Sequence, residues 1–524
     1  MATVSTQKKS VLDRFLSTVE RVGNKLPDSN LLFILLALTV AVVSAICAAA
    51  NVSAIHPATG AEIKAWSILT KEGIRWAIKS TLVNFTGFAP LGVVMVALVG
   101  TGIAEKSNFL TVFMSKILGS APPKLVTAAI IFVSINGNMA GDSAFVFMPP
   151  LAAVVFLGLG RSPMLGMYIA FGSVAAGFCA NLFINGLDFL IAPLTAQAAK
   201  FIDPAYETTA ANNWYYLIVS CILLTIVGTL VAEYFLAPRF EGVDISKYNF
   251  DKSMLNLTPQ QQKGLKWAII SLVLAILLIV VLCIGKEALL RDENGSLISL
   301  GSTLMAGLLV VTTFLFLVPS AVYGFVSGQY KNHRDFFNSM TEAFKDMAPY
   351  VMLCIFCGQF TAYFNKSNLG AILAIKSAEL LQPVKQYPIP LLVGIVIISC
   401  IVNLFIGSSS AKWTILAPVF VPMMMILGYD PSLTQIAYRM GDSITNPLSV
   451  LFPYFPILLG IARRYEKETG VGSIVANMIP ISFCFGVTWI VLLIIWVFFK
   501  LPLGPGGQLF LPNFQALLSA FHFA

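Results

Sequence analysis

Long apolar segments follow one another along the whole chain, and two of them are interrupted by small polar residues. A helix that spans a bilayer needs about 20 apolar residues. Nine segments meet this requirement, near residues 29–52, 83–104, 163–188, 213–236, 264–285, 300–327, 346–364, 431–462 and 476–500. Two further stretches, 123–160 and 388–427, are too long for one span and just long enough to enter a bilayer and turn back. The pattern predicts nine transmembrane helices and two re-entrant hairpins.

The turns of the two hairpins are the most informative part of this pattern. Their tips carry short polar side chains: Asn136, Asn138, Asp142 and Ser143 in the first, Ser408 and Ser409 in the second. Backbone N–H and C=O groups of a turn at membrane depth cannot face lipid, so they must be buried in protein or line a wet cavity. Two such turns in one chain predict a solute site at the tips of the hairpins.

Composition supports the same class of protein. The 524 residues are 57% hydrophobic and 11% charged, with a mean hydropathy of +0.83, which excludes an ordinary soluble domain. We therefore predict an all-α polytopic membrane protein in contact with lipid. The net charge of +8 does not predict a nucleic-acid partner, because basic cytoplasmic loops are common in membrane proteins.

Charge in the loops predicts the orientation of the chain. With the N-terminus inside, 20 of the 33 Lys and Arg residues fall in cytoplasmic segments and 11 outside, while Lys412 and Arg439 lie at membrane depth. The prediction is a cytoplasmic N-terminus with an interfacial helix (1–28), a first transmembrane half (29–236), a cytoplasmic loop (237–263), a second half (264–500) and a periplasmic C-terminal tail (501–524).

The two halves resemble each other in sequence. Lys106-Ser107-Asn108 follows the second span and Lys366-Ser367-Asn368 follows the seventh. The spacing of 13 residues between Pro150 and Pro163 recurs between Pro418 and Pro431. Five spans separate the paired elements. Because this number is odd, the two halves should have opposite orientations in the membrane. Such an inverted repeat is characteristic of secondary transporters, although Pro, Gly and Ser can also match by chance in apolar sequence.

A few ionisable residues lie at membrane depth, where each costs on the order of 2.5–3.5 kcal/mol. Asp188 ends the third predicted span, and Arg439 and Asp442 share one face of the eighth because they are three residues apart. Arg439 and Asp442 either neutralise each other to fix helix packing or do chemistry. In the second case Arg439 holds a substrate carboxylate with its planar fork, and Asp442 takes a proton or helps bind a cation. Pro447, with Asn446 beside it, should break this span and free carbonyl groups for the cation.

Other residues leave alternatives open. Trp413 beside the second turn is either a packed indole or a stacking surface for an aromatic ligand. An intramembrane hydrolase is not expected, because the chain has no His-Glu-x-x-His and no Gly-x-Ser-x-Gly motif. A channel is the other rival class. The acidic and basic groups at both breaks favour a binding site over a pore.

Ordered matches along nearly the whole chain resemble the AbgT family, the p-aminobenzoyl-glutamate transporters. They lie at residues 19–27 (VERVGNKLP), 84–92 (NFTGFAPLG), 102–107 (GIAEKS), 180–182 (ANL), 407–413 (GSSSAKW), 417–423 (APVFVPM), 438–439 with 441–443, and 501–506 (LPLGPG). This chain departs from the family pattern at one position. Relatives commonly carry a proline eleven residues after the arginine that corresponds to Arg439. This chain has Val450 there and Pro447 three residues earlier.

The resemblance implies a homodimer in the bacterial inner membrane, with nine spans and two hairpins in each subunit. It implies ion-coupled transport of p-aminobenzoyl-glutamate or related aromatic anions, sulfonamide antimetabolites included. Another small carboxylate or a passive facilitator is the alternative. The positions important in the family correspond to Asp188, Ser410, Trp413, Pro431, Arg439 and Asp442. We expect substrate contacts from the first five of these, and ion coupling at Asp188, Asp442 and Asn446. The coupling ion would be H⁺ or Na⁺, with Na⁺ near Asp442, and no other cofactor is expected.

Overall fold

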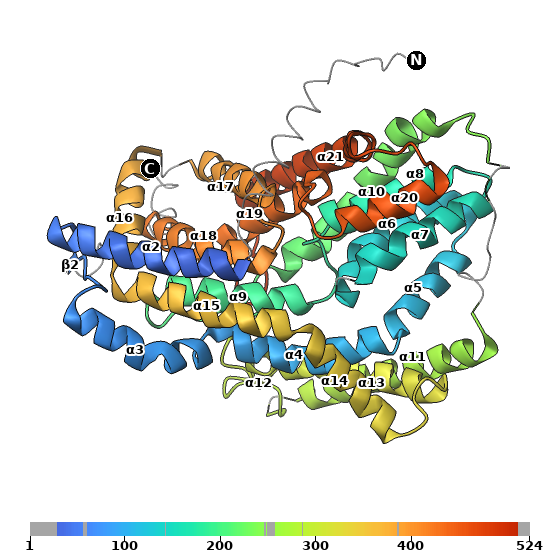
Figure 1. Ribbon diagram of the computed structural model, residues 1–524. Coiled ribbons are helices and arrows are strands. Elements are labelled where there is room, and N and C mark those ends of the chain that lie inside the picture. Colours follow the sequence, from blue (N-terminus) through green and yellow to red (C-terminus); the bar gives the residue numbers. More distant parts are fainter. Residues whose placement is uncertain are drawn as a thin grey trace, which may run out of the picture.

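The first half of the chain is a series of helices with one short β-hairpin. The computed structural model describes residues 29–55, 60–141, 143–245, 248, 257–285, 287–384 and 387–511 (Figure 1). The predicted interfacial helix in 1–28 and the hairpin residue Asp142 lie outside these ranges. The elements are α2 (Ser29–Ala49), β1 (Ser53–Ile55), β2 (Glu62–Lys64), α3 (Lys71–Thr86), α4 (Ala89–Lys106), α5 (Phe109–Ser120), α6 (Val126–Asn136), α7 (Ser143–Gly158), α8 (Pro163–Ala176), α9 (Gly186–Ala199) and α10 (Trp214–Val231). β1 and β2 pair antiparallel, with Ala54 opposite Ile63.

The second half is helical throughout its described part. Its elements are α11 (Pro259–Cys283), α12 (Thr303–Ala306), α13 (Leu308–Val326), α14 (His333–Asp346), α15 (Ala348–Lys366), α16 (Leu369–Leu381), α17 (Pro388–Asn403), α18 (Ser409–Ile426), α19 (Pro431–Ile444), α20 (Phe455–Tyr465) and α21 (Val471–Phe498). The described residues contain seven helices long and apolar enough to cross a membrane, or nine if each of two bent helix pairs counts as one span. The all-helical, multi-pass class of the prediction is confirmed.

The same order of elements occurs twice, from α4 to α10 and from α15 to α21. In each series a long helix ends at Lys-Ser-Asn, and Asn108 and Asn368 both adopt the left-handed conformation, with φ of 57° and 61°. Asparagine tolerates this region better than other residues with a Cβ. Gly160 and Gly428, which precede the matching prolines, also have positive φ. The sequence matches therefore mark equivalent turns, and the opposite orientation of the halves stays a prediction.

Both hairpins form where the sequence predicts them. α6 and α7 make the first, joined by a 3₁₀ turn at Gly137–Ala140, and α17 and α18 make the second, joined by residues 404–408. The predicted break of the eighth span is also present. α19 ends at Ile444, a 3₁₀ turn follows at Asn446–Leu448, and α20 begins at Phe455. Proline at 447 cannot donate the helical hydrogen bond and clashes with the preceding turn.

The predicted third span, 163–188, is wrong as one helix. α8 ends at Ala176, residues 177–185 are irregular, and α9 begins at Gly186. The irregular backbone is bonded by buried side chains: Leu182 N–H donates to Asn136 Oδ1 (3.1 Å), Leu182 C=O accepts from the Trp214 indole (2.9 Å), and Cys179 N–H donates to Ser443 Oγ (3.2 Å). Non-helical backbone at membrane depth is stable when protein surrounds it in this way. Hydropathy does not reveal the break, because the residues involved are apolar except for Asn181 and Asn185.

Two other predicted spans are interrupted, and five helices lie mostly outside the predicted spans. The second predicted span, 83–104, is divided between α3 and α4, because Pro90 starts a new helix after Gly87. The sixth, 300–327, is continuous only from Leu308, after the Gly307 that ends α12. The helices that lie mostly outside the predicted spans are α3, α5, α9, α14 and α16.

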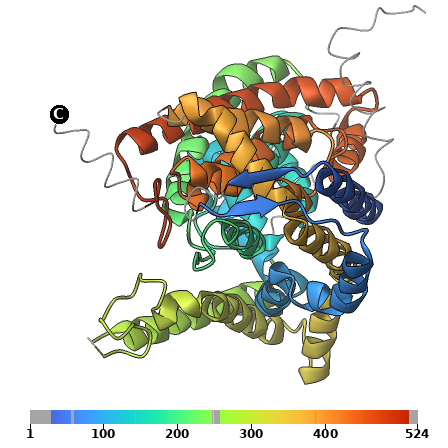
Figure 2. The ribbon, with the colours of Figure 1, turned by 90° about the vertical axis from the view of Figure 1, so that its left-hand side faces the viewer.

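The arrangement in space separates an arm from the main bundle. Figure 2 shows α11 and α13, in yellow-green, projecting to one side, and α13 packs on α4. The broken helices and the two hairpins lie in the bundle, where all of α8 and α19 up to Ser443 is buried. Residues 501–511, predicted as part of a tail, pack against the bundle. Leu503 C=O accepts from Tyr216 N–H (3.2 Å), and Leu509 C=O from Asp430 N–H (3.1 Å).

Candidate functional site

The first half of the broken helix, α19, carries the buried polar groups. Pro431 occupies its first turn, where the missing N–H costs nothing, and Asp430 caps the helix by accepting from Ser432 N–H (2.8 Å). Burial raises the pKa of the Asp430 carboxyl to about 6, although hydrogen bonds from Ser432 and Tyr206 act in the other direction. Pro431 therefore sets the start of the helix and lies eight residues before Arg439 rather than beside it.

Arg439 and Asp188 form an ion pair that water does not reach. Arg439 Nη1 lies 2.6 Å from Asp188 Oδ1, and the exposed fractions of the two side chains are 0% and 1%. The second carboxylate oxygen of Asp188 accepts from Asn185 N–H (2.8 Å), while Asn185 Oδ1 accepts from Leu187 N–H (3.0 Å). This capping box at the start of α9 fixes the direction of the Asp188 carboxylate. This ion pair links the break between α8 and α9, in the first half, to the broken helix α19 in the second half.

The interpretation of Arg439 and Asp442 as a mutually neutralising pair is wrong, because each has another partner. Arg439 pairs with Asp188, and Asp442 forms an ion pair with Lys412 of α18. A spacing of three residues places two side chains on one face of a helix, but neighbouring helices decide which charges meet. Lys412 and Asp442 are each 1% exposed, so both ion pairs lie in the interior of the bundle.

The guanidinium of Arg439 retains unused donors. Its Nε and Nη2 atoms are buried and have no hydrogen-bond partner among the described residues. The Cys179 thiol, which is a weak acceptor, lies beside the group. A buried donor without a partner costs about 1–3 kcal/mol, and more for a charged group. An acidic ligand that accepted from these two nitrogens would remove this cost.

Asp442 is held by three side chains from the second hairpin and its own helix. Besides Lys412, Ser409 Oγ donates to Asp442 Oδ2 (2.7 Å) and Tyr438 Oη to Oδ1 (3.2 Å). Lys412 Nζ also donates to Asn403 Oδ1, at the other arm of the hairpin. Ser409 and Lys412 belong to the first turn of α18, whose cap Ser408 accepts from Ala411 N–H (3.4 Å). The hairpin tip is thus tied to α19 through Asp442.

Asn446 connects the two breaks of the fold. Its Nδ2 donates to Ala175 C=O at the end of α8 (3.3 Å), and its Oδ1 accepts from Asn403 Nδ2 (2.9 Å), which also donates to the Asp442 carbonyl (2.8 Å). The residue therefore lies in the cluster as predicted, but its amide oxygen already has a partner. The described residues contain no group of three or more His, Cys, Asp or Glu side chains that could hold a metal ion.

Trp413 is a packed indole in this conformation. It is fully buried, its ring stacks on that of Tyr438 with centroids 4.4 Å apart, and its Nε1 donates to Thr195 Oγ1 of α9 (2.9 Å). Ser410, one turn earlier, faces a small space between α18, α9 and α15, and its carbonyl accepts from Thr414. These contacts place Trp413 between α19 and α9, and Ser410 beside α9 and α15. A stacking contact of Trp413 with a ligand stays a prediction.

The tip of the first hairpin is tied to the break between α8 and α9 instead. Asn136 Oδ1 accepts from Leu182 N–H, its Nδ2 donates to Phe132 C=O (2.9 Å), and Asn138 Nδ2 donates to Val174 C=O (3.2 Å). Ser143 is the first residue of α7. The predicted tip residues therefore form two groups, one at each broken helix, and not a single ring around Arg439.

A buried chain of amides continues the site, and the sequence analysis missed it. Thr195 Oγ1 donates to Gln435 Oε1 (2.6 Å), and Gln435 Nε2 donates to Asn212 Oδ1 (3.0 Å) and Asn213 Oδ1 (2.8 Å). All four side chains are fully buried. The sequence signal that could have revealed this chain is the position of Gln435, four residues before Arg439 and therefore on the same face of the helix.

Comparison with known proteins identifies the family. A family model described as the AbgT putative transporter family matches residues 14–511. The chain belongs to the AbgT family. It is 33% identical to the p-aminobenzoyl-glutamate transport protein of Escherichia coli (strain K12) over 509 residues, covering 97% of this chain and 99% of that protein.

Two solved AbgT-family structures share the fold. The YdaH transporter of Alcanivorax borkumensis, described as having an unusual topology, has a TM-score of 0.86 and 37% identity, covering 91% of this chain and all of that one. MtrF of Neisseria gonorrhoeae, described in connection with a class of antimetabolite efflux pumps, has a TM-score of 0.88 and 36% identity, covering 94% of this chain and all of that one. This AbgT-family chain is therefore a multi-pass membrane transporter.

The cap of α9 offers a test of how Asp188 is positioned. Asn185→Ala should lower the free energy of unfolding by about 0.5–2 kcal/mol, the usual loss for such a cap. It should also weaken ligand binding, because the first turn of α9 loses the side-chain bond to Leu187 N–H, and this loosens the turn whose residue 185 N–H holds the Asp188 carboxylate. Thermal unfolding and ligand binding of the purified protein measure the two effects.

Asn332→Ala is the matched control for this test. Asn332 caps α14 by accepting from Asp335 N–H (3.1 Å), far along the chain from the site. The control should lose similar stability and keep ligand affinity. Equal affinities of the two variants would mean that the Asn185 cap has no part in positioning Asp188.

Proposed function

We propose that this AbgT protein is an ion-coupled secondary transporter of p-aminobenzoyl-glutamate or related aromatic anions, sulfonamide antimetabolites included. The observation that supports this most is the Arg439 guanidinium, fully buried and with two donors unused. The E. coli relative carries p-aminobenzoyl-glutamate in its name, and MtrF is described with antimetabolite efflux pumps. A buried fork of two N–H donors suits a carboxylate, which accepts two parallel hydrogen bonds.

In this proposal the Asp188 carboxylate holds Arg439 in place through Nη1 and leaves Nε and Nη2 for the ligand. Ser410 and Trp413 would contact its aromatic part, because both lie on the part of α18 that faces α9 and Trp413 also packs on α19, the helix of the arginine. One face of the Trp413 ring already stacks on Tyr438. A ligand ring would therefore use the other face or displace Tyr438. Pro431 would act by fixing where α19 begins, and not by touching the ligand.

We further propose that the coupling ion is H⁺ and that Asp442 carries it. The Lys412 ammonium occupies the place beside the Asp442 carboxylate where Na⁺ would bind. Two cations in one buried site repel each other, so Na⁺ is disfavoured while this ion pair exists. Protonation of Asp442 would dissolve the pair and weaken the link between the hairpin tip and α19. Asp188 and Asn446 would then support the site without carrying the ion.

The assembly and its orientation complete the proposal. We place the protein in the bacterial inner membrane as a homodimer with the N-terminus in the cytoplasm and the two halves inverted. The excess of Lys and Arg in the alternate loops and the repeated order of elements support the orientation. Membership of the AbgT family supports the membrane and the dimer.

Flux of radiolabelled p-aminobenzoyl-glutamate in proteoliposomes tests the function. We expect uphill flux that follows an imposed pH gradient, reverses when the gradient is reversed, and does not follow a Na⁺ gradient. Flux driven by Na⁺ alone would reject the proton assignment. Saturable flux that runs only downhill would indicate a facilitator. If neither p-aminobenzoyl-glutamate nor a sulfonamide moved, the substrate assignment would be wrong.

A further inference from the structure

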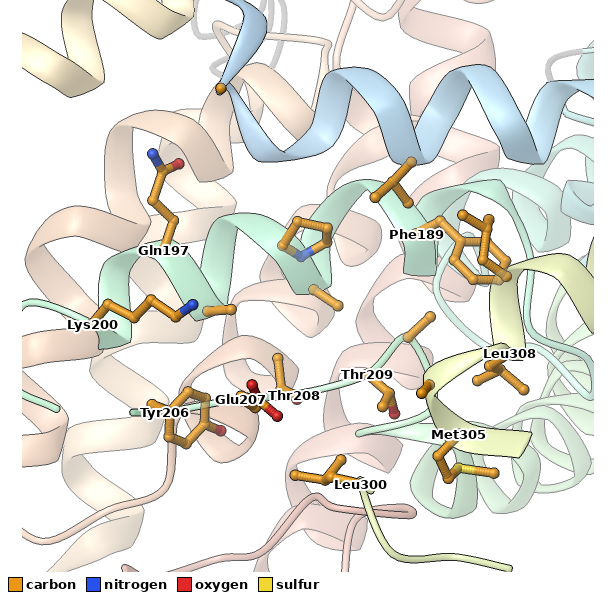
Figure 3. Close-up of a pocket in the computed structure, with 18 residues that line it drawn as sticks. Phe189, Gln197, Lys200, Tyr206, Glu207, Thr208, Thr209, Leu300, Met305 and Leu308 are labelled. Carbon is orange, nitrogen blue, oxygen red and sulfur yellow. The ribbon is translucent and has the colours of Figure 1, made fainter. Parts of the chain in front are cut away.

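A cavity of about 540 Å³ lies on the side of α9 that faces away from Trp413 (Figure 3). Its walls come from α9, from the segment 206–210 that follows it, from α12 and α13 of the arm, and from Gly87 and Val93. The volume is within the range of about 300–1,000 Å³ that is usual for small-molecule sites. The cavity therefore lies between the arm and the bundle that contains Arg439.

The lining combines an apolar body with a few polar groups. Phe189, Pro193, Leu300, Met305 and Leu308 supply apolar surface that suits an aromatic ring. Lys200, Gln197 and Glu207 supply the polar part, and Figure 3 shows the Lys200 amine directed toward the cavity.

Lys200 is the cation of this cavity, and it is available to a ligand. No ion pair or hydrogen bond joins its ammonium to another described residue, so Glu207 lies beyond ion-pair distance. An ammonium beside an apolar wall is the combination that binds an aromatic carboxylate, because the ring leaves water while the charge keeps a partner.

Two smaller spaces lie around α9 between this cavity and the second hairpin. Gln197 lines the cavity and also a space of about 10 Å³ against α18 that Leu194 and Thr414 share. Leu194 and Thr414 line a second space of the same size, which Ser410 also lines. Each space can hold about one water molecule. Leu194 is thus a lining residue of both small spaces.

We propose that this cavity is a second binding site, an antechamber that holds the transported aromatic carboxylate through Lys200 before it passes Leu194 to the site at Arg439. The antechamber rests on the proposed function, because it takes its ligand class from that function.

Protection of an introduced thiol tests the antechamber without relying on transport. In Gln197→Cys, p-aminobenzoyl-glutamate should slow labelling by a membrane-impermeant maleimide, measured against the labelling of the unsubstituted chain. Adding Lys200→Gln should shift the protecting concentration about tenfold upward, because one charge-assisted hydrogen bond is lost. Lys200→Arg should retain protection. Lys116→Gln, which removes an exposed lysine of α5, is the matched control and should change nothing.

The same measurement in an Arg439→Ala background separates the two sites. Protection that persists there, while flux is lost, supports an independent antechamber. Flux in the Gln197→Cys protein without any protection overturns the antechamber and leaves the proposed function standing. Absence of both flux and ligand binding in the unsubstituted protein overturns the substrate assignment itself. Leu194→Ala should accelerate ligand entry at unchanged equilibrium affinity, and an unchanged entry rate would reject the path around α9.

Discussion

Arg439→Ala is expected to abolish flux of p-aminobenzoyl-glutamate and its binding at the Arg439 site, leaving only the binding at the antechamber. The substitution removes the two unused donors that the ligand carboxylate would occupy, and it also leaves Asp188 as a buried charge without its partner. Breaking a buried ion pair from one side costs about 3–5 kcal/mol, so the variant should also unfold at a lower temperature. Equilibrium binding to the purified protein, together with thermal unfolding, measures both effects.

A double variant separates loss of binding from loss of stability. In Asp188→Asn/Arg439→Gln no charge is left unpaired, so much of the stability should return while binding stays lost. Arg439→Lys keeps the charge and loses the planar fork, and we expect intermediate affinity. Unchanged affinity in Arg439→Ala would mean that this arginine only holds the two broken helices together.

Asp442→Asn is expected to uncouple transport from the pH gradient while ligand binding remains. The amide cannot take up the proton that the proposal assigns to Asp442, so uphill accumulation should stop. Exchange of labelled for unlabelled ligand across the membrane needs no net proton movement and should continue. Flux with and without a pH gradient, compared with this exchange, measures the effect.

The partner of Asp442 provides the control for this second prediction. Asp442→Asn alone leaves the Lys412 ammonium buried without its carboxylate, which is destabilising. Asp442→Asn/Lys412→Gln removes both charges, should regain stability and should stay uncoupled. Gradient-driven accumulation equal to that of the unsubstituted protein in either variant would exclude Asp442 as the proton carrier.

The sequence alone determined the class of the protein, both hairpins and the break at Pro447. These features follow from local causes: apolar length sets a span, a polar turn at membrane depth must be sheltered, and proline cannot continue a helix. The repeated Lys-Ser-Asn sequences, and the glycines three residues before the matching prolines, mark equivalent turns in the two halves, because left-handed backbone selects Asn and Gly locally. The sequence also identified the candidate ionisable residues at membrane depth, because a charge there is costly and therefore rare.

The tertiary structure decided which of these residues meet. Arg439 pairs with Asp188, and Asp442 pairs with Lys412. The spacing along α19 had suggested instead that Arg439 and Asp442 could pair with each other. The break at 177–185 lies in a largely apolar stretch, and Asn136, Trp214 and Ser443 from distant elements bond its backbone. The cavity beside Lys200 likewise needs the arm to lie beside α9. Hydrogen bonds and ion pairs between helices depend on distances that packing sets, and no local pattern in the chain encodes them.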